Sequence, residues 1–266
     1  MNKMNNLESE TKKHVIDLLG KGMRLDGRKP LEYRKPLKVS YGVSVNAEGS
    51  ARVQIGETVV FAGVKLAIEQ PYPDTPDEGL LMVGAELLPL ANPKFEMGPP
   101  SIEAIELARV VDRGIRESGF IDMKKLCIEP GEKAWSVMID ICPINDAGNL
   151  FDASALAAFA ALKNAVFPAV VDGKIDYGTK TNKKLPLTDA NPVSVTVFKI
   201  GDYFIVDPTT EEEELYDARL TVASMGDGRL CALQKGGDVA LSADEISRMV
   251  NIGIQYGKEL RKLVVK

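Results

Sequence analysis

The order in which strand-like and helix-like segments follow one another constrains the fold of this 266-residue chain most. β-branched residues alternate over 50–55 and 58–68, and Gly56-Glu57 between these runs is typical of a hairpin turn. Further regular segments are expected as a strand at 80–91 that is buried on both faces, a helix at 102–118, strands at 125–130 and 134–145, and an Ala-rich helix from 151 that stops at Pro168. This mixed order predicts an α/β (α+β) sandwich of mixed sheets and argues against a doubly wound Rossmann fold.

The last third of the chain and its N-terminal segment contain the remaining predicted elements. Polar, turn-forming residues at 172–192 predict a linking loop, after which come four short strands and a helix, at 193–200, 203–207, 218–225, 230–235 and 242 to about 264. Apolar residues at helical spacing over 7–22 predict a leading helix. We therefore divide the chain into an N-terminal helix at 1–22 and two halves of one compact core, at 23–171 and 172–266.

Composition excludes several classes of protein. The chain has no run of about 18 apolar residues, and its first residues are polar, so we expect a cytoplasmic protein with no membrane partner. Its three cysteines are far apart and its single histidine is His14, which makes a zinc site or a Cys/His catalytic pair improbable. The net charge of −5 excludes a general polycation, so any nucleic-acid binding requires a local basic patch.

The helix at 102–118 carries such a patch. Arg109, Arg113 and Arg116 follow the spacing i, i+4 and i+7, which places them within a sector of about 60°. The opposite side is apolar or small and should pack inward: Leu107, Ala108, Val110, Val111, Gly114 and Ile115. Two interpretations stay open, namely contact with phosphates or intrahelical ion pairs of Glu106 with Arg109 and of Asp112 with Arg116, each worth about 0.5 kcal/mol or less.

Five motifs carry a resemblance to a known family across nearly the whole chain. In order they are RLDGRKP at 24–30, GSARVQIGETVVFAGVKLAI at 49–68, ELLPLANPKFEMGPPSIEAIELARVVDRGIRESG at 86–119, DPTTEEEELYDARLTVA at 207–223 and GDGRLCALQKGG at 226–237. Together they resemble the RNase PH superfamily. Within it, the segment at 87–118 is similar to the non-catalytic RNase PH-like subunit of the archaeal exosome.

The resemblance implies an RNase PH fold of two ββαβα-type halves of the ribosomal protein S5 domain 2-like kind. It also implies a hexameric ring of three heterodimers with a catalytic RNase PH-like subunit, RNA-binding cap subunits, and degradation of single-stranded RNA from its 3′ end. The complex would use inorganic phosphate and Mg²⁺, with neither bound by this chain. The arginines matching those that hold RNA in the family are Arg109 and Arg113, with Arg116 a weaker candidate because Asp112 is near it.

Two departures from active members suggest that this chain is itself catalytically inactive. The segment at 147–152 aligns with their phosphate loop, but it holds Leu150 and Phe151 in place of donors, and Asp152 should repel phosphate. Arg219 stands where active members have an aspartate, and it can neither act as a base nor bind Mg²⁺. Glu213 falls at another family carboxylate, although 211–214 can also be interpreted as an exposed acidic turn.

Two other functions remain open at this stage. One is an autonomous phosphate-dependent 3′-5′ exoribonuclease that uses Glu213, and the other is a free RNA-binding module without a nuclease partner. The motif at 24–30 also has two interpretations, either a turn held by Asp26 and Gly27 or a subunit contact made by Arg28.

Overall fold

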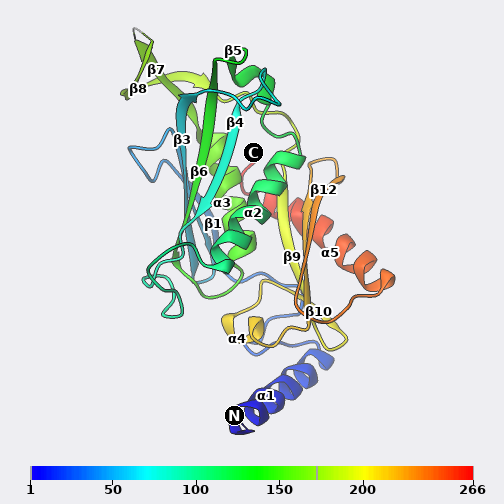
Figure 1. Cartoon of the computed structure of the whole chain (residues 1–266). Helices are drawn as coiled ribbons and strands as arrows, with labels where there is room; N and C mark the ends of the chain where they lie inside the picture. The colour runs from blue at the N-terminus through cyan, green and yellow to red at the C-terminus, as the bar shows by residue number, and fades with distance from the viewer. Residues whose placement is uncertain (1, 172, 266) are drawn as a thin grey trace.

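The computed structural model describes residues 2–171 and 173–265, with side chains from residue 9 onward. Its core has four layers, in the order sheet, helix pair, sheet, helix (Figure 1). The first sheet has the strand order β1-β2-β3-β6-β4, with β5 pairing β6, and all its pairs are antiparallel except β4 with β6. Its strands are β1 (Leu37–Tyr41), β2 (Gly49–Ile55), β3 (Thr58–Glu69), β4 (Leu80–Ala85), β5 (Cys127–Glu129) and β6 (Lys133–Asn145).

The second sheet is entirely antiparallel, with the order β10-β9-β11-β12. Its strands are β9 (Val193–Ile200), β10 (Tyr203–Val206), β11 (Ala218–Ser224) and β12 (Leu230–Gly236). Helix α5 (Ala243–Arg261) covers the outer face of this sheet (Figure 1). It packs closely because Gly253 has no side chain, and a Cβ there would lie 2.6 Å from that of Val222.

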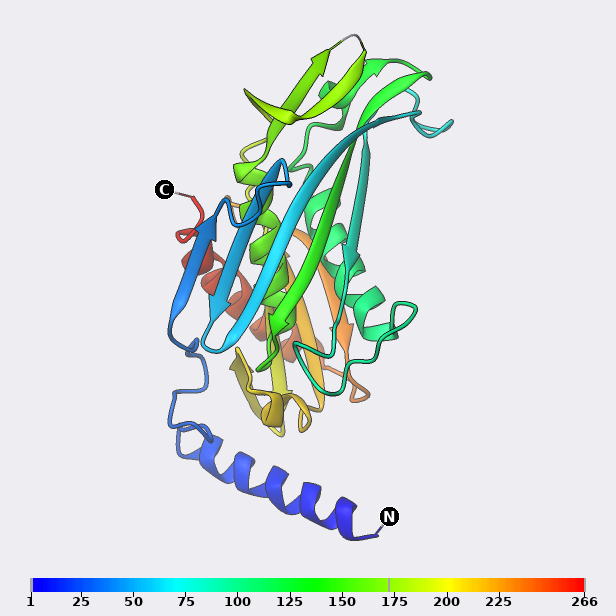
Figure 2. The ribbon, with the colours of Figure 1, turned by 90° about the vertical axis from the view of Figure 1, so that its left-hand side faces the viewer.

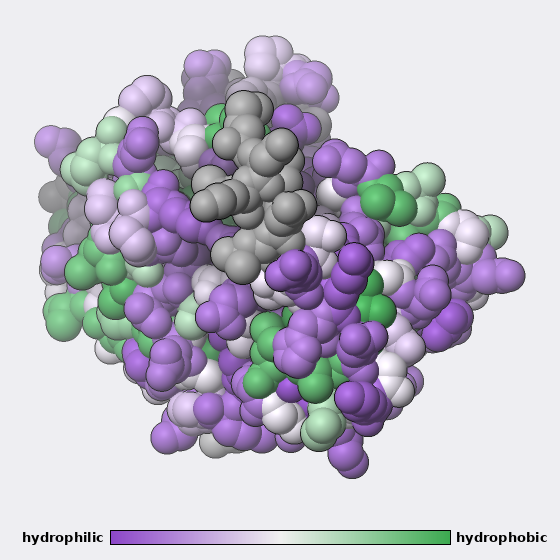
Figure 3. All heavy atoms as spheres, turned by 90° about the horizontal axis from the view of Figure 1, so that it is seen from below, coloured by the Kyte–Doolittle hydropathy of each residue, from purple (hydrophilic) through white to green (hydrophobic). Residues whose placement is uncertain are grey.

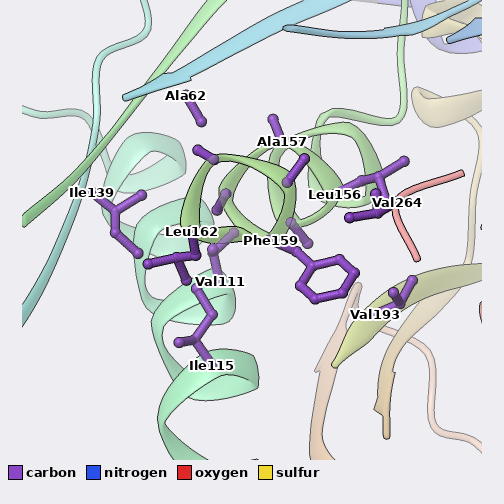
Figure 4. Close-up of a cluster of buried hydrophobic side chains, with 14 of the residues drawn as sticks. Ala62, Val111, Ile115, Ile139, Leu156, Ala157, Phe159, Leu162, Val193 and Val264 are labelled. Carbon is purple, nitrogen blue, oxygen red and sulfur yellow. The ribbon is translucent and has the colours of Figure 1, made fainter. Parts of the chain in front are cut away.

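Helices α2 (Ile102–Glu117) and α3 (Leu150–Asn164) fill the space between the two sheets. Figure 4 shows Phe159 and Leu162 of α3 among side chains from both sheets, including Ala62 of β3 and Val193 of β9. Residues 153–162 of α3 are all buried, and most of them are alanines, which let the helix lie close to the strands. The core therefore fixes α2 and α3 against each other, and this positions the candidate site.

Helix α1 (Asn2–Gly20) projects from the end of the core near β10 (Figures 1 and 2). Val15 and Leu19 attach it by packing in a small apolar cluster with Phe198 and Ile205. Seen from this end, the visible surface is mainly hydrophilic with separate small hydrophobic patches (Figure 3). No helix in the described ranges is long and apolar enough to cross a membrane.

Most predicted elements are confirmed within a few residues. The hairpin of β2 and β3 has the expected two-residue turn, since Ile55 pairs with Thr58. The leading helix, the helix at 102–118, the four late strands and the closing helix are also present. The sequence missed two short helices, η1 (Met123–Leu126) and α4 (Thr210–Glu213).

Three predictions about elements were wrong. The strand expected at 80–91 is the shorter β4, which is half exposed because it lies at the edge of its sheet, with Met82 39% exposed. The helix expected to stop at Pro168 ends at Asn164, where Ala165 turns to extended backbone and β7 (Val166–Val171) begins. The loop expected at 172–192 contains β8 (Lys174–Lys184), which forms a ribbon with β7 and has mainly exposed side chains, so it shows no apolar alternation.

Candidate nucleic-acid interface

Local sequence signals fix the position of α2. Ser101 caps the helix, because its side chain accepts a hydrogen bond from the backbone N–H of Ala104. Gly119 follows the helix with φ of 60°, a conformation that glycine adopts without strain. All six residues predicted to face inward are buried, whereas Arg109, Arg113 and Arg116 are exposed. The predicted arginine face on α2, defined as these three residues, is therefore present.

The three arginines differ in how far their guanidinium groups are already bound. Arg116 donates two hydrogen bonds to Asp112, of 3.0 and 2.7 Å, and a third to the carbonyl of Leu81. Arg113 makes one long contact, 3.5 Å from the Oε1 of Gln234. Within the described ranges, the side chain of Arg109 has no hydrogen bond or ion pair. Intrahelical ion pairing therefore accounts for Arg116 and not for Arg109.

Glu106, the expected partner of Arg109, binds another residue. Its Oε1 lies 2.7 Å from the Nη2 of Arg219, which is only 6% exposed. The guanidinium of Arg219 also lies over the ring of Phe151, 4.3 Å from the centroid, in a cation–π contact. Arg219 thus links α2, α3 and β11, and it lies in the interior rather than in an open pocket.

Asp152 does not face a site where phosphate could dock, so that prediction was wrong. Its carboxylate is fully buried and accepts hydrogen bonds from the Tyr33 hydroxyl at 2.6 Å, the Thr196 N–H at 2.7 Å and the Asn149 side chain at 3.3 Å. Burial raises the pKa of Asp152 to about 7, against the effect of these hydrogen bonds. Asp152 therefore joins α3 to its neighbours in the core.

The start of a helix favours anions, and a carboxylate of this chain lies just before the start of α3. Glu213 accepts a hydrogen bond of 2.7 Å from the N–H of Asn149, the residue before the helix. Burial raises the pKa of Glu213 to about 7, and the charge of Asp146 adds to this effect. The carboxylate of Glu213 thus binds the N–H directly before the first turn of α3.

The acidic segment at 211–214 is only partly the exposed turn that was considered. Glu211 and Glu214 are exposed, but Glu212 is fully buried and forms an ion pair with the equally buried Arg24. A groove next to this segment is bounded by 85–104 and α4. Its acidic lining residues are Glu86, Glu96, Glu103, Asp146, Glu211, Glu213 and Glu214. These seven acidic residues outnumber the one basic lining residue, Lys94, so the groove repels a polyanion such as RNA.

The motif at 24–30 forms the predicted turn. The N–H of Arg28 donates to Asp26, and Gly27 has φ of 82°. The side chain of Arg28 binds within the chain, to Asp26 at 2.6 Å and Asp207 at 3.2 Å. Sequence reasoning missed this internal role, because Asp207 lies far from the motif along the chain.

The carboxylates near the start of α3 are bound to cations, amides or a hydroxyl of the same chain. Asp207 accepts from Arg34 at 2.7 Å and from Asn149 at 2.9 Å, as well as from Arg28. Among the residues that the structure describes, no three histidine, cysteine or acidic side chains are grouped so as to hold a metal ion.

Comparison with known proteins identifies the family. The model described as 3′ exoribonuclease family, domain 1, matches residues 33–168, and the model for domain 2 of the same family matches residues 190–256. The chain belongs to the RNase PH family. The predicted superfamily is therefore confirmed.

Curated members of the RNase PH family match over nearly the full length. A protein of Thermoplasma acidophilum named exosome complex component Rrp42 is 45% identical over 251 residues, which cover 94% of each chain. A protein of the same name from Methanosarcina acetivorans is 44% identical over 267 residues, covering 100% of this chain and 98% of the relative.

Solved structures agree with the predicted RNase PH fold. A chain of the Archaeoglobus fulgidus exosome with RNA bound to the active site superposes with a TM-score of 0.88 at 44% identity, covering 96% of this chain and 98% of the other. A chain of an archaeal exosome core gives a TM-score of 0.86 at 40% identity and covers 99% of both chains. Rice Rrp46, at 17% identity and a TM-score of 0.67, shares the fold.

Proposed function

We propose that this chain is the non-catalytic, RNA-binding subunit of an archaeal exosome, a 3′-5′ phosphorolytic exoribonuclease complex. The observation that carries the proposal is a difference between two parts of the molecule, the exposed face of α2 and the start of α3. Arg109 and Arg113 on α2 are exposed and their side chains have at most one long contact, whereas the N–H of Asn149, directly before α3, is already bound by Glu213. The names of the similar full-length relatives support the assignment to an exosome complex.

The arginine face suits an RNA chain of any sequence. A guanidinium group donates two parallel hydrogen bonds to phosphate oxygens and makes no distinction between bases. Arg109 and Arg113 lie one turn apart on an exposed face of a helix that is fixed on its other side by the core. Arg116 contributes less, because binding a phosphate would compete with its two hydrogen bonds to Asp112.

The residues around the start of α3 support the proposal that this chain is catalytically inactive. Phosphorolysis needs donors that hold the attacking phosphate in line, and this chain offers Leu150 and Phe151 where donors are required. The N–H of Asn149 is already bound by Glu213. Arg219 is buried and bound to Glu106, so it neither acts as a base nor binds a metal ion.

A non-catalytic RNA-binding subunit requires partners that carry out the reaction. The catalytic subunit would be a second RNase PH-like chain that binds inorganic phosphate and Mg²⁺, and the two would alternate in a hexameric ring of three heterodimers. RNA-binding cap subunits would complete the complex, which would act on single-stranded RNA in the cytoplasm. The arginine face would hold the RNA beside the active site of the catalytic partner.

The experiment that tests catalytic silence replaces Glu213 with glutamine and measures phosphorolysis by the assembled complex. The amide of Gln can keep the hydrogen bond from Asn149 while losing the charge, so the rate should stay within about twofold of the wild type. A loss of a hundredfold or more would show that Glu213 belongs to a working active site. Tight RNA binding by a chain that joins no nuclease partner would instead favour the free RNA-binding module.

A further inference from the structure

Arg219 is a buried cation whose contacts the proposed function does not yet explain. Its Nη2 is 2.7 Å from the Oε1 of Glu106, and its guanidinium lies over the Phe151 ring. The backbone of β12 closes the remaining space, since a Cβ on Gly236 would lie 2.6 Å from the Cζ of Arg219. The guanidinium is therefore held in one orientation by an aromatic ring, a strand and a carboxylate.

Glu106 precedes Arg109 by three residues on α2, a spacing at which oppositely charged side chains form ion pairs. In this structure Glu106 is paired with Arg219 of β11 instead. Within the described ranges the side chain of Glu106 bonds to Arg219, and the side chain of Arg109 has neither a hydrogen bond nor an ion pair. A free Glu106 would also repel an RNA phosphate near Arg109, within the screening length of about 8 Å in physiological salt.

We infer that Arg219 is a positioning residue for the RNA face, which binds the carboxylate of Glu106 and so leaves Arg109 available to a phosphate. This inference rests on the proposed function, because it assigns Arg219 a role in RNA binding by the arginine face. Arg219 touches no RNA in this account and takes no part in the chemistry. It acts only through the carboxylate that it holds.

The test measures the dissociation constant of a 5′-labelled oligoadenylate from the assembled complex. Arg219→Gln releases Glu106 and should weaken binding about two- to fivefold, the upper value being that of one lost phosphate contact at about 0.1 M salt. Arg219→Gln combined with Glu106→Gln should restore wild-type affinity, since no free carboxylate remains beside Arg109. A double variant that binds as weakly as Arg219→Gln would show that Arg219 serves the fold alone and would overturn the inference.

A second variant keeps the inference testable if loss of Arg219 prevents folding. Ile105 is 48% exposed and lies four residues before Arg109, so Ile105→Glu adds a carboxylate on the surface. It should weaken RNA binding about two- to fivefold relative to the matched control Ile105→Gln. Equal affinities of these two variants would overturn the inference, because Arg109 would then be insensitive to a neighbouring free carboxylate.

Arg109→Ala separates this inference from the proposed function. If Arg109→Ala weakens binding and Arg219→Gln does not, the arginine face stands and the role of Arg219 is wrong. If Arg109→Ala has no effect on RNA binding, the assignment of the arginine face as the RNA-binding surface is wrong. In the Arg109→Ala background, Arg219→Gln should cause a smaller loss than in the wild type, because the Arg109 side chain that Arg219 leaves available is absent.

Discussion

Replacing Arg109 and Arg113 with alanine removes the two guanidinium groups that the structure leaves most available. Each is exposed, and the only hydrogen bond between them and the rest of the described chain is the 3.5 Å contact of Arg113 with Gln234. Their removal should therefore change RNA binding more than stability. If each neutralises one phosphate of a single strand, the slope of log K against log salt should fall in magnitude by about 1.4, and affinity at about 0.1 M salt should fall about 25-fold.

The assay is equilibrium binding of a labelled single-stranded RNA to the assembled complex over a range of salt concentrations. Arg116→Ala is the matched control, since Asp112 already binds the Arg116 guanidinium through two hydrogen bonds. Its effect on the slope should be less than that of either Arg109→Ala or Arg113→Ala. A double variant with an unchanged slope would refute the assignment of Arg109 and Arg113 as phosphate contacts.

Three further predictions concern stability. Burial raises the pKa of Glu213 from 4.5 to about 7, so ionisation of this side chain destabilises the fold as pH rises through that range. The free energy of unfolding of Glu213→Gln, measured with urea, should therefore exceed that of the wild type by up to about 3 kcal/mol above pH 8 and should equal it at pH 4. Gly236→Ala places a Cβ 2.6 Å from the Cζ of Arg219 and should lower unfolding stability by about 1–3 kcal/mol, whereas no loss on thermal unfolding would contradict the close packing. Arg24→Met leaves the buried Glu212 carboxylate unpaired and should lower the free energy of unfolding by about 3–5 kcal/mol, as followed by circular dichroism during denaturation. The double variant with Glu212→Gln should recover part of that loss.

Local signals made α2 and its arginine face predictable. The Ser101 cap, Gly119 after the helix and the spacing of the arginines all lie within one short segment, and helix geometry then determines which side chains share a face. The same holds for the hairpin of β2 and β3, where a two-residue turn fixes the register. These features depend on neighbours along the chain, so the sequence was sufficient.

Contacts between distant residues could not be predicted in this way. Arg24 and Glu212 are 188 positions apart, and only the folded chain brings them together as a buried pair. The sequence showed the charge of Asp152 but not its inward orientation, which depends on Tyr33 and Thr196 from other strands and loops. Opposite charge at short spacing was misleading as well, because Glu106 binds a residue of β11 rather than its neighbour on α2.

The central claim is that this chain holds RNA without cleaving it. The most direct test is phosphorolysis of a 5′-labelled poly(A) RNA, with phosphate and Mg²⁺, by this chain alone, by its RNase PH-like partner alone, and by the two together. The account predicts that this chain alone leaves the RNA intact and that the mixture releases nucleoside diphosphates faster than the partner alone. Phosphate-dependent shortening of the RNA by this chain alone would contradict it.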